Sequence, residues 1–339
     1  MASTLAAALS LSVIIPIYNE EANLAALYQR LTGVLGGLHL PGGYELLFVN
    51  DGSHDGSLAL LRALAAGDGR VRYLDFSRNF GHQIAVTAGL DRAEGAAVVI
   101  IDADLQDPPE LIAALYQKLG QGYEVVYAKR RSRQGESAAK KLTAKLFYRL
   151  LARITRISIP VDTGDFRIIS RRVVLALRQM PEQHKFLRGQ IAWVGFRQTF
   201  VEYDRAERLA GETGYTYRKM LNFALDGITG FSDAPLKAST LMGFTVSGIA
   251  FLLMLYTLYA RLARHDYEPG WASLMMSILF LGGVQLIAVG IIGEYIARLS
   301  ANVRQRPLYI IAESDHDPNP DPSGKKEQSQ QAGGKGRGF

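Results

Sequence analysis

Cysteine is absent from the 339 residues of this sequence, which excludes disulfide bonds and thiolate metal sites. This absence agrees with a cytoplasmic location for the polar part of the chain. A strongly basic composition is also missing: the net charge is +6 and no nucleic-acid reader motif is present, so we expect anionic lipid and phosphate partners and no nucleic acid. The apolar residues 1–18 lack the basic start of a signal peptide, so we expect a first β-strand there.

Charged residues are missing from two long apolar runs, 239–260 and 271–293. At about 1.5 Å per helical residue, each run can cross a hydrocarbon core of about 30 Å. Buried helices of a soluble core are the alternative, but these rarely stay apolar over such a length. The positive-inside bias predicts a multi-pass inner-membrane protein with both termini in the cytoplasm. Arg261 and Arg264 lie in the short connection, against Arg218, Lys219, Lys237, Arg298, Arg304 and Arg306 outside it.

Short β-rich runs alternate with helical periodicity from Leu11 to about Arg130. This alternation predicts an α/β fold with a mostly parallel sheet and helices on both faces. Apolar residues recur at helical spacing in 24–35 and 111–119, so we expect two helices there that cover the sheet. The expected strands are 12–17, 44–49, 71–76, 97–101 and 124–128.

The fourth apolar strand ends in two carboxylates, Asp102 and Asp104. Two residues apart in extended chain, they point to the same side, and such oxygen ligands suit Mg²⁺ or Mn²⁺ holding a diphosphate. An isolated Asp-x-Asp is more often a solvated turn. Here, however, Asn19 and Asp51 also follow predicted strands. Because the carboxyl ends of parallel strands meet at one edge, where ligands bind, we expect three polar loops in one crevice.

Beyond about residue 130 the periodicity changes. Residues 140–156 are typical of a basic amphipathic helix at a membrane surface, although an ordinary solvated helix packed on the core fits equally well. Residues 215–231 predict an interfacial helix. A stripe of small residues in the first apolar run lets helices approach closely, either within the hairpin or in the homo-oligomer that we expect; it consists of Ser239, Gly243 and Ser247.

Four motifs together resemble family 2 glycosyltransferases, in particular the polyprenyl-phosphate branch. That branch includes dolichol-phosphate mannose synthases and the bacterial undecaprenyl-phosphate glucosyltransferases with two C-terminal spans. The resemblance covers about residues 10 to 310 and implies a GT-A-like, Rossmann-like domain. The motifs are Ser12-Val13-Ile14-Ile15-Pro16-Ile17-Tyr18-Asn19-Glu20, Val49-Asn50-Asp51-Gly52-Ser53, Arg78-Asn79-Phe80-Gly81 and Asp102-Ala103-Asp104-Leu105-Gln106.

The resemblance implies roles for the residues of the crevice. A divalent ion, Mg²⁺ or Mn²⁺, would neutralise the charge that builds on the leaving UDP. By resemblance, the nucleotide contacts are Pro16, Tyr18, Glu20, Asp51 and Asp102, and the metal ligands are Asp102, Asp104 and Gln106.

Basic residues are expected to hold the phosphates. Arg208 matches a family loop whose basic residue closes over the pyrophosphate, a bidentate role that suits arginine; a juxtamembrane arginine held by lipid phosphate is the alternative. The family often has Ser-Lys before the tyrosine of this loop, where the present chain has Thr213-Gly214. For the acceptor phosphate we expect Arg130, Arg131 and Arg133.

Asp165 matches the family motif beyond the metal site and is, with Asp104, the expected catalytic residue. A polyprenyl phosphate, with a second pKa of about 6 by analogy with phosphate monoesters, is already a nucleophilic anion, so no base is required. We therefore expect Asp165 to orient the donor sugar or the metal shell. His54, His82 and His184 are scattered without ligand spacing, so we do not expect them in the site.

The expected reaction is metal-dependent, inverting transfer of a hexose, with glucose expected, from a UDP-sugar to undecaprenyl phosphate. The alternatives are a non-catalytic membrane scaffold or subunit that assists lipid-linked sugar translocation, and a processive polysaccharide synthase. The last is disfavoured because Gln-x-x-Arg-Trp is absent and only two spans are predicted. The expected domains are catalytic 1–210, interfacial 211–235, transmembrane 236–300, and a tail 301–339 that is disordered from about residue 314.

Overall fold

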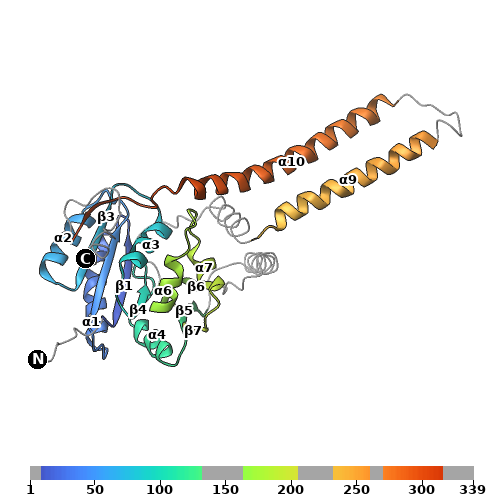
Figure 1. Ribbon diagram of the computed structural model, residues 1–339. Coiled ribbons are helices and arrows are strands. Elements are labelled where there is room, and N and C mark those ends of the chain that lie inside the picture. Colours follow the sequence, from blue (N-terminus) through green and yellow to red (C-terminus); the bar gives the residue numbers. More distant parts are fainter. Residues whose placement is uncertain (1–8, 132–162, 205–231, 260–269, 316–339) are drawn as a thin grey trace, which may run out of the picture. The chain divides into compact units, whose positions relative to one another are not determined.

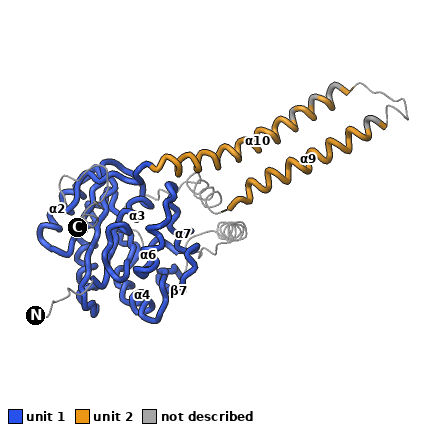
Figure 2. The backbone as a smooth tube through the Cα atoms, in the orientation of Figure 1, with its two compact units in different colours: residues 1–138, 160–214, 306–339 blue, residues 139–159, 215–305 orange. Residues whose placement is uncertain are grey.

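The computed structural model describes residues 9–131, 163–204, 232–259 and 270–315 (Figure 1). The chain divides into two compact units (Figure 2). Unit 1 comprises residues 1–138, 160–214 and 306–339, and unit 2 comprises 139–159 and 215–305. The helices expected at 140–156 and 215–231 lie outside the described residues.

Unit 1 contains an eight-stranded mixed sheet in the order β7-β5-β6-β4-β1-β2-β3-β8. The strands β1, β2, β3 and β4 are parallel, whereas β6 runs antiparallel to both of its neighbours and β8 antiparallel to β3. The five expected strands are present, with ends that differ from the expected ones by at most two residues; β6, β7 and β8 were not expected. The bounds are β1 Leu11–Ile17, β2 Tyr44–Asn50, β3 Val71–Phe76, β4 Ala97–Ile100, β5 Val125–Arg130, β6 Thr163–Ser170, β7 Gln198–Tyr203 and β8 Ile311–Ser314.

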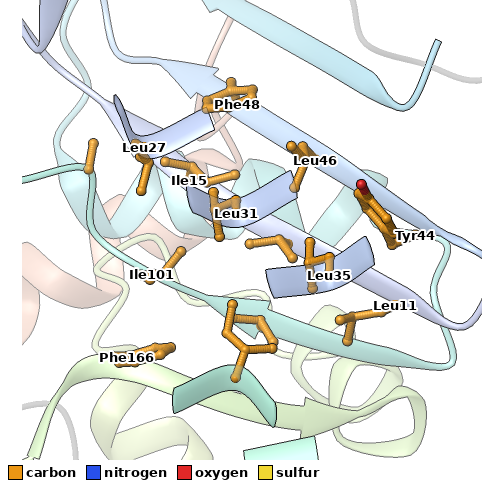
Figure 3. Packing of buried hydrophobic residues seen from close by; sticks show 14 of the residues in the cluster. Leu11, Ile15, Leu27, Leu31, Leu35, Tyr44, Leu46, Phe48, Ile101 and Phe166 are labelled. Carbon is orange, nitrogen blue, oxygen red and sulfur yellow. The ribbon is translucent and has the colours of Figure 1, made fainter. Parts of the chain in front are cut away.

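Helices cover both faces of this sheet, so alternate residues of β1 belong to different cores. Val13 and Ile15 face α1, α2 and α4, whereas Ile14 faces α3, α6 and α7, as the period of two in a strand requires. Figure 3 shows Leu27, Leu31 and Leu35 of α1 in the core that contains Val13 and Ile15. The helices are α1 Glu21–Gly36, α2 Ser57–Gly67, α3 His82–Arg92, α4 Leu111–Gly120, α6 Arg171–Arg178 and α7 Leu187–Trp193.

Unit 2 contributes two long apolar helices, α9 Ala234–Tyr259 and α10 Trp271–Arg304. Their candidate spans, Ala234–Tyr256 and Met276–Arg304, have mean hydropathies of 1.8 and 2.1. This composition is that of membrane-associated helices. The second helix continues past the expected end at residue 293 and stops where Gln305 adopts a left-handed conformation with φ 48°, a common helix end.

The chain after α10 rejoins the sheet. The sequence predicted a tail that is disordered from about Ser314; just before that point, Ile311–Ser314 form β8 and pair with β3. The sequence gives no local sign of this pairing, because β8 is short and its partners lie far away in the chain. Residues 316–339 lie outside the described residues.

Candidate functional site

The loops after β1 and β2 are joined by hydrogen bonds at the carboxyl edge of the sheet. The Asn19 N–H donates to Ser53 Oγ at 2.9 Å, the His54 N–H donates to Asn19 Oδ1 at 2.8 Å, and the Glu20 N–H donates to Ser57 Oγ at 3.1 Å. Asn19 can make these contacts because it adopts a left-handed conformation, with φ 56°, which asparagine tolerates better than most residues.

The expected nucleotide contacts of the first loop differ in accessibility. Tyr18 leaves 47% of its surface exposed, Glu20 is half-buried, and Pro16 is buried within β1 beside Val49 of β2. Tyr18 and Glu20 are therefore accessible to a ligand at this edge, whereas Pro16 is part of the buried strand that precedes the loop.

Asp51 holds the loop that precedes α3. Its side chain is 3% exposed and accepts hydrogen bonds from the N–H groups of Phe80 at 2.6 Å and Gly81 at 2.9 Å. Burial raises the pKa of Asp51, against the lowering effect of these two N–H groups. Gly52 lies against the same loop: with φ +67°, a Cβ there would come within 2.5 Å of the Arg78 carbonyl carbon.

The two carboxylates after β4 differ in their surroundings. Asp104 accepts a hydrogen bond from the Gln106 N–H at 3.1 Å, and the side chain of Gln106 is buried. Asp102 Oδ1 is buried and has no hydrogen-bond partner among the described residues. Burial raises the pKa of Asp102 to about 6, with nearby carboxylates adding to the effect and His82 opposing it.

These oxygens fit part of a divalent-metal site. Within the described ranges, no three His, Cys, Asp or Glu side chains are grouped closely enough to hold a metal by themselves. A Mg²⁺ site, however, commonly takes one or two carboxylates and completes its coordination with substrate phosphates and water. Asp102 Oδ1, which accepts no hydrogen bond among the described residues, and Asp104 two residues away match that kind of incomplete donor set.

The antiparallel β6 brings Asp165 to the same place. Ile100 of β4 pairs with Arg167 of β6, so Asp165 lies opposite the residue that follows β4 by two positions, Asp102. Asp165 Oδ1 accepts hydrogen bonds from Arg188 Nε at 2.9 Å and Arg167 Nη2 at 3.1 Å. Burial alone would raise the pKa of Asp165, but Arg188, His82 and Arg167 hold it well below its usual range.

His82, which the sequence analysis placed outside the site, is part of it. Its Nε2 lies 3.2 Å from Asp165 Oδ2 and 3.6 Å from Asp102 Oδ1. Partial burial lowers its pKa, but the hydrogen bond to Asp165 and the charges of both carboxylates outweigh this and raise it to about 9. The available signal was its position directly after the Arg78–Gly81 motif. His54 and His184 are exposed.

The basic residues expected at the acceptor phosphate fall into different positions. Arg130 lies beside the glycine that precedes Asp165: a Cβ on Gly164 would be 3.0 Å from Arg130 Nη2. Arg131 is exposed and pairs with Asp204 at 3.4 Å. Arg133 and Arg208 lie outside the described residues. The structure thus adds His82, Arg167 and Arg188 to the site residues that the sequence predicted.

Comparison with known proteins covers both units. Residues 12–178, which include the strand-end carboxylates and Asp165, match the model of glycosyl transferase family 2, and residues 234–299 match the GtrB C-terminal hairpin. A relative from Bacillus subtilis, "Uncharacterized glycosyltransferase YkcC", is 51% identical over 303 residues, covering 89% of this chain and 93% of the relative. The chain belongs to glycosyl transferase family 2. It is therefore a glycosyltransferase with a C-terminal pair of membrane-associated helices.

Other family 2 relatives carry more specific names. The SfII prophage-derived bactoprenol glucosyl transferase of Shigella flexneri is 42% identical over 312 residues, covering 92% of this chain and all of that protein. Among solved structures, a glucosyl-3-phosphoglycerate synthase from Mycobacterium tuberculosis, crystallised with Mn²⁺, UDP and phosphoglyceric acid, overlaps with a TM-score of 0.43 at 20% identity. That overlap covers 65% of this chain and 76% of the other.

Proposed function

We propose that this glycosyltransferase transfers glucose from UDP-glucose to undecaprenyl phosphate, or a similar polyprenyl phosphate, and releases UDP. One observation carries the proposal: the chain matches a bactoprenol glucosyl transferase over that protein's whole length at 42% identity, hairpin included. The residues at the carboxyl edge of the sheet include the types that such a transfer needs: carboxylates for a metal bound to the diphosphate and arginines for an acceptor phosphate.

A divalent cation, Mg²⁺ or Mn²⁺, is proposed to be held by Asp102, Asp104 and Gln106. When bound, it would supply Lewis-acid stabilisation of the charge on the departing diphosphate. The buried Oδ1 of Asp102 supports this assignment, since it accepts no hydrogen bond among the described residues and a buried carboxylate oxygen is suited to a cation. Asp51, Tyr18 and Glu20 are proposed to contact the nucleotide.

Asp165 is proposed to position groups in the site and not to act as a general base. Three cationic or hydrogen-bonding groups surround its carboxylate, so its proton affinity is low. A base has to take up a proton, and a carboxylate held this far below its usual pKa does so poorly. The polyprenyl phosphate is itself an anion and needs no base, so a single displacement with inversion at the sugar carbon is the proposed course.

Membrane attachment would bring the transferase to its lipid acceptor. We propose that α9 and α10 span the inner membrane with the catalytic unit and both termini in the cytoplasm, on the basis of the arginine and lysine distribution. Arg130, Arg131 and Arg133 are proposed to hold the acceptor phosphate, and Arg208 the pyrophosphate. A homo-oligomer is part of the same proposal, resting on the small-residue stripe of α9.

The test uses the purified full-length chain in detergent with Mg²⁺ or Mn²⁺, undecaprenyl phosphate, and a panel of UDP- and GDP-sugars. We expect UDP release and glycolipid formation with UDP-glucose, both dependent on the acceptor and the metal. Asp104→Asn should abolish metal-dependent turnover, whereas Asp68→Asn, at the opposite edge of the sheet, should retain it. If none of the donors releases nucleotide, the result would favour a non-catalytic scaffold. An α-linked product from the α-linked donor would contradict inversion.

A further inference from the structure

The segment 306–315, here named the C-terminal strap, follows α10 and forms the outer edge of the sheet. It pairs antiparallel with β3, with Asp75 opposite Glu313 and Phe76 opposite Ile311. The pairing continues beyond the strand, because the Ser77 N–H donates to the Ile310 carbonyl at 3.0 Å. Ser77 begins the segment 77–81, here named the nucleotide loop, so the strap reaches that loop directly.

One end of the strap is held by charged and polar contacts away from the carboxyl edge of the sheet. Glu313 accepts hydrogen bonds from the guanidinium of Arg62, at 2.8 and 2.5 Å, and from the Tyr73 hydroxyl at 2.5 Å. Arg72 Nε lies 3.4 Å from Asp315. These contacts fasten the strap to β3 and α2.

The other end of the strap packs toward the nucleotide loop through aromatic rings. Tyr309 stacks on Phe76, with ring centroids 5.2 Å apart and an interplanar angle of 18°, and its hydroxyl donates to Asp91 at 3.1 Å. Phe76 in turn meets Phe80 edge to face, at 5.6 Å and 87°. Tyr309 therefore supports Phe80, a residue of the nucleotide loop, through one intervening ring.

The nucleotide loop is thus held from two sides. On one side Asp51 accepts the N–H groups of Phe80 and Gly81, and Gly52 lies against the backbone of Arg78. On the other side, the Ile310 carbonyl of the strap accepts the Ser77 N–H, and Tyr309 contacts Phe80 through the ring of Phe76. Within the loop, the guanidinium of Arg78 lies 4.0 Å from the centroid of the Phe80 ring.

We infer that the strap holds the nucleotide loop in the conformation that binds the uridine diphosphate of the donor, with Tyr309 as a positioning residue. The inference rests on the proposed nucleotide-binding role of Asp51. A loop that is ordered before binding loses less conformational freedom when the ligand arrives, so the affinity is higher. Loss of the Tyr309 ring should therefore weaken donor binding and leave acceptor binding unchanged.

The experiment compares Tyr309→Leu with Tyr28→Leu in the full-length protein. Tyr28 is a matched control: it is also a half-buried tyrosine whose hydroxyl donates to an aspartate, Asp68, but it packs on the opposite face of the sheet. The readouts are the Kd for UDP with Mn²⁺ by calorimetry, the KM values for UDP-glucose and for undecaprenyl phosphate, and the Tm.

We expect Tyr309→Leu to raise the Kd for UDP and the KM for UDP-glucose about threefold to tenfold, the range of an aromatic pair, with the KM for the acceptor unchanged. Tyr309→Phe, which keeps the ring, should bind UDP nearly as the wild type does. Tyr28→Leu should lower the Tm without changing the Kd for UDP or either KM value.

The results separate this inference from the proposed function. If the wild type binds UDP and Tyr309→Leu binds it equally well, or if Tyr28→Leu weakens UDP binding to the same extent, the positioning role of Tyr309 is overturned while the proposed function stands. If the wild type binds no UDP, the proposed function fails, and the inference fails with it.

Discussion

Asp165→Asn is the most informative substitution in the site, because it keeps the shape of the side chain and removes its charge. In the wild type the carboxylate is 14% exposed and faces Arg188, Arg167 and His82. Hydrogen bonds to charged groups contribute about 1.5–3 kcal/mol each. Because Arg167 is 1% exposed, the substitution also leaves a buried positive charge without its anion, for which a loss of about 3–5 kcal/mol is typical.

We therefore expect the Asp165→Asn protein to be less stable by about 3 kcal/mol or more. Turnover should fall by at least about 100-fold, because a loss of about 3 kcal/mol in the placement of groups around the reacting sugar corresponds to about two powers of ten in rate. The assay is UDP release from UDP-glucose with undecaprenyl phosphate, measured below the Tm of the variant so that unfolding does not contribute.

Asp68→Asn is the matched control, since Asp68 also pairs with an arginine, Arg70, at 2.8 Å, but outside the site. This variant should retain turnover. Near-normal turnover of Asp165→Asn would refute the role assigned to Asp165. Arg188→Gln offers a second check, because removing the 2.9 Å contact should reduce turnover in the same direction as Asp165→Asn.

Two further substitutions test the contact of Gly52 with the loop 77–81 and a partly exposed ion pair. Gly52→Ala should lower the free energy of unfolding by about 1–2 kcal/mol and weaken UDP binding, because the new Cβ would displace the backbone of Arg78; calorimetric values equal to the wild type would contradict this. The hydrogen bond from Arg70 lowers the pKa of Asp68 from its usual 3.8 to about 2. Because the pKa of Asp68 is lower in the folded than in the unfolded protein, its carboxylate stabilises the folded state at neutral pH, and this stabilisation is lost as the pH falls from about 4 to 2. Asp68→Asn should therefore be less stable than the wild type by about 1 kcal/mol at pH 7, since solvent screens a partly exposed pair. The difference in stability should close near pH 2. A constant difference across that range in denaturation experiments would show that the ion pair is not its cause.

Local patterns were sufficient for much of the fold. The alternation of apolar strands with helical stripes predicted β1 to β5, and the leucine stripe of α1 is fully buried as expected, from Leu24 to Leu35. Two of the polar loops could be placed together because β1 and β2 are parallel, which puts their carboxyl ends at one edge. The length and composition of the two apolar runs likewise predicted the helices of unit 2.

Patterns that depend on distant partners could not be found in this way. The residues of β6 pair antiparallel with β4 and β5, and nothing in their own order specifies that reversal. The place of Asp165 beside Asp102 follows from this register. His82 gave only a weak signal, because its partners are 20 and 83 residues away along the chain and only the folded sheet brings them within reach.

The sequence by itself determined the elements whose stability is local or repetitive: apolar strands, amphipathic helices, membrane-length helices and the strand-end motifs. Tertiary structure alone decided how Asp165 is surrounded by Arg188, Arg167 and His82, and how the strap after α10 returns to β3 and contacts the loop 77–81. The physical reason is that both arrangements consist of contacts between residues far apart in the chain, whose free energy is gained only after the sheet has fixed their distances.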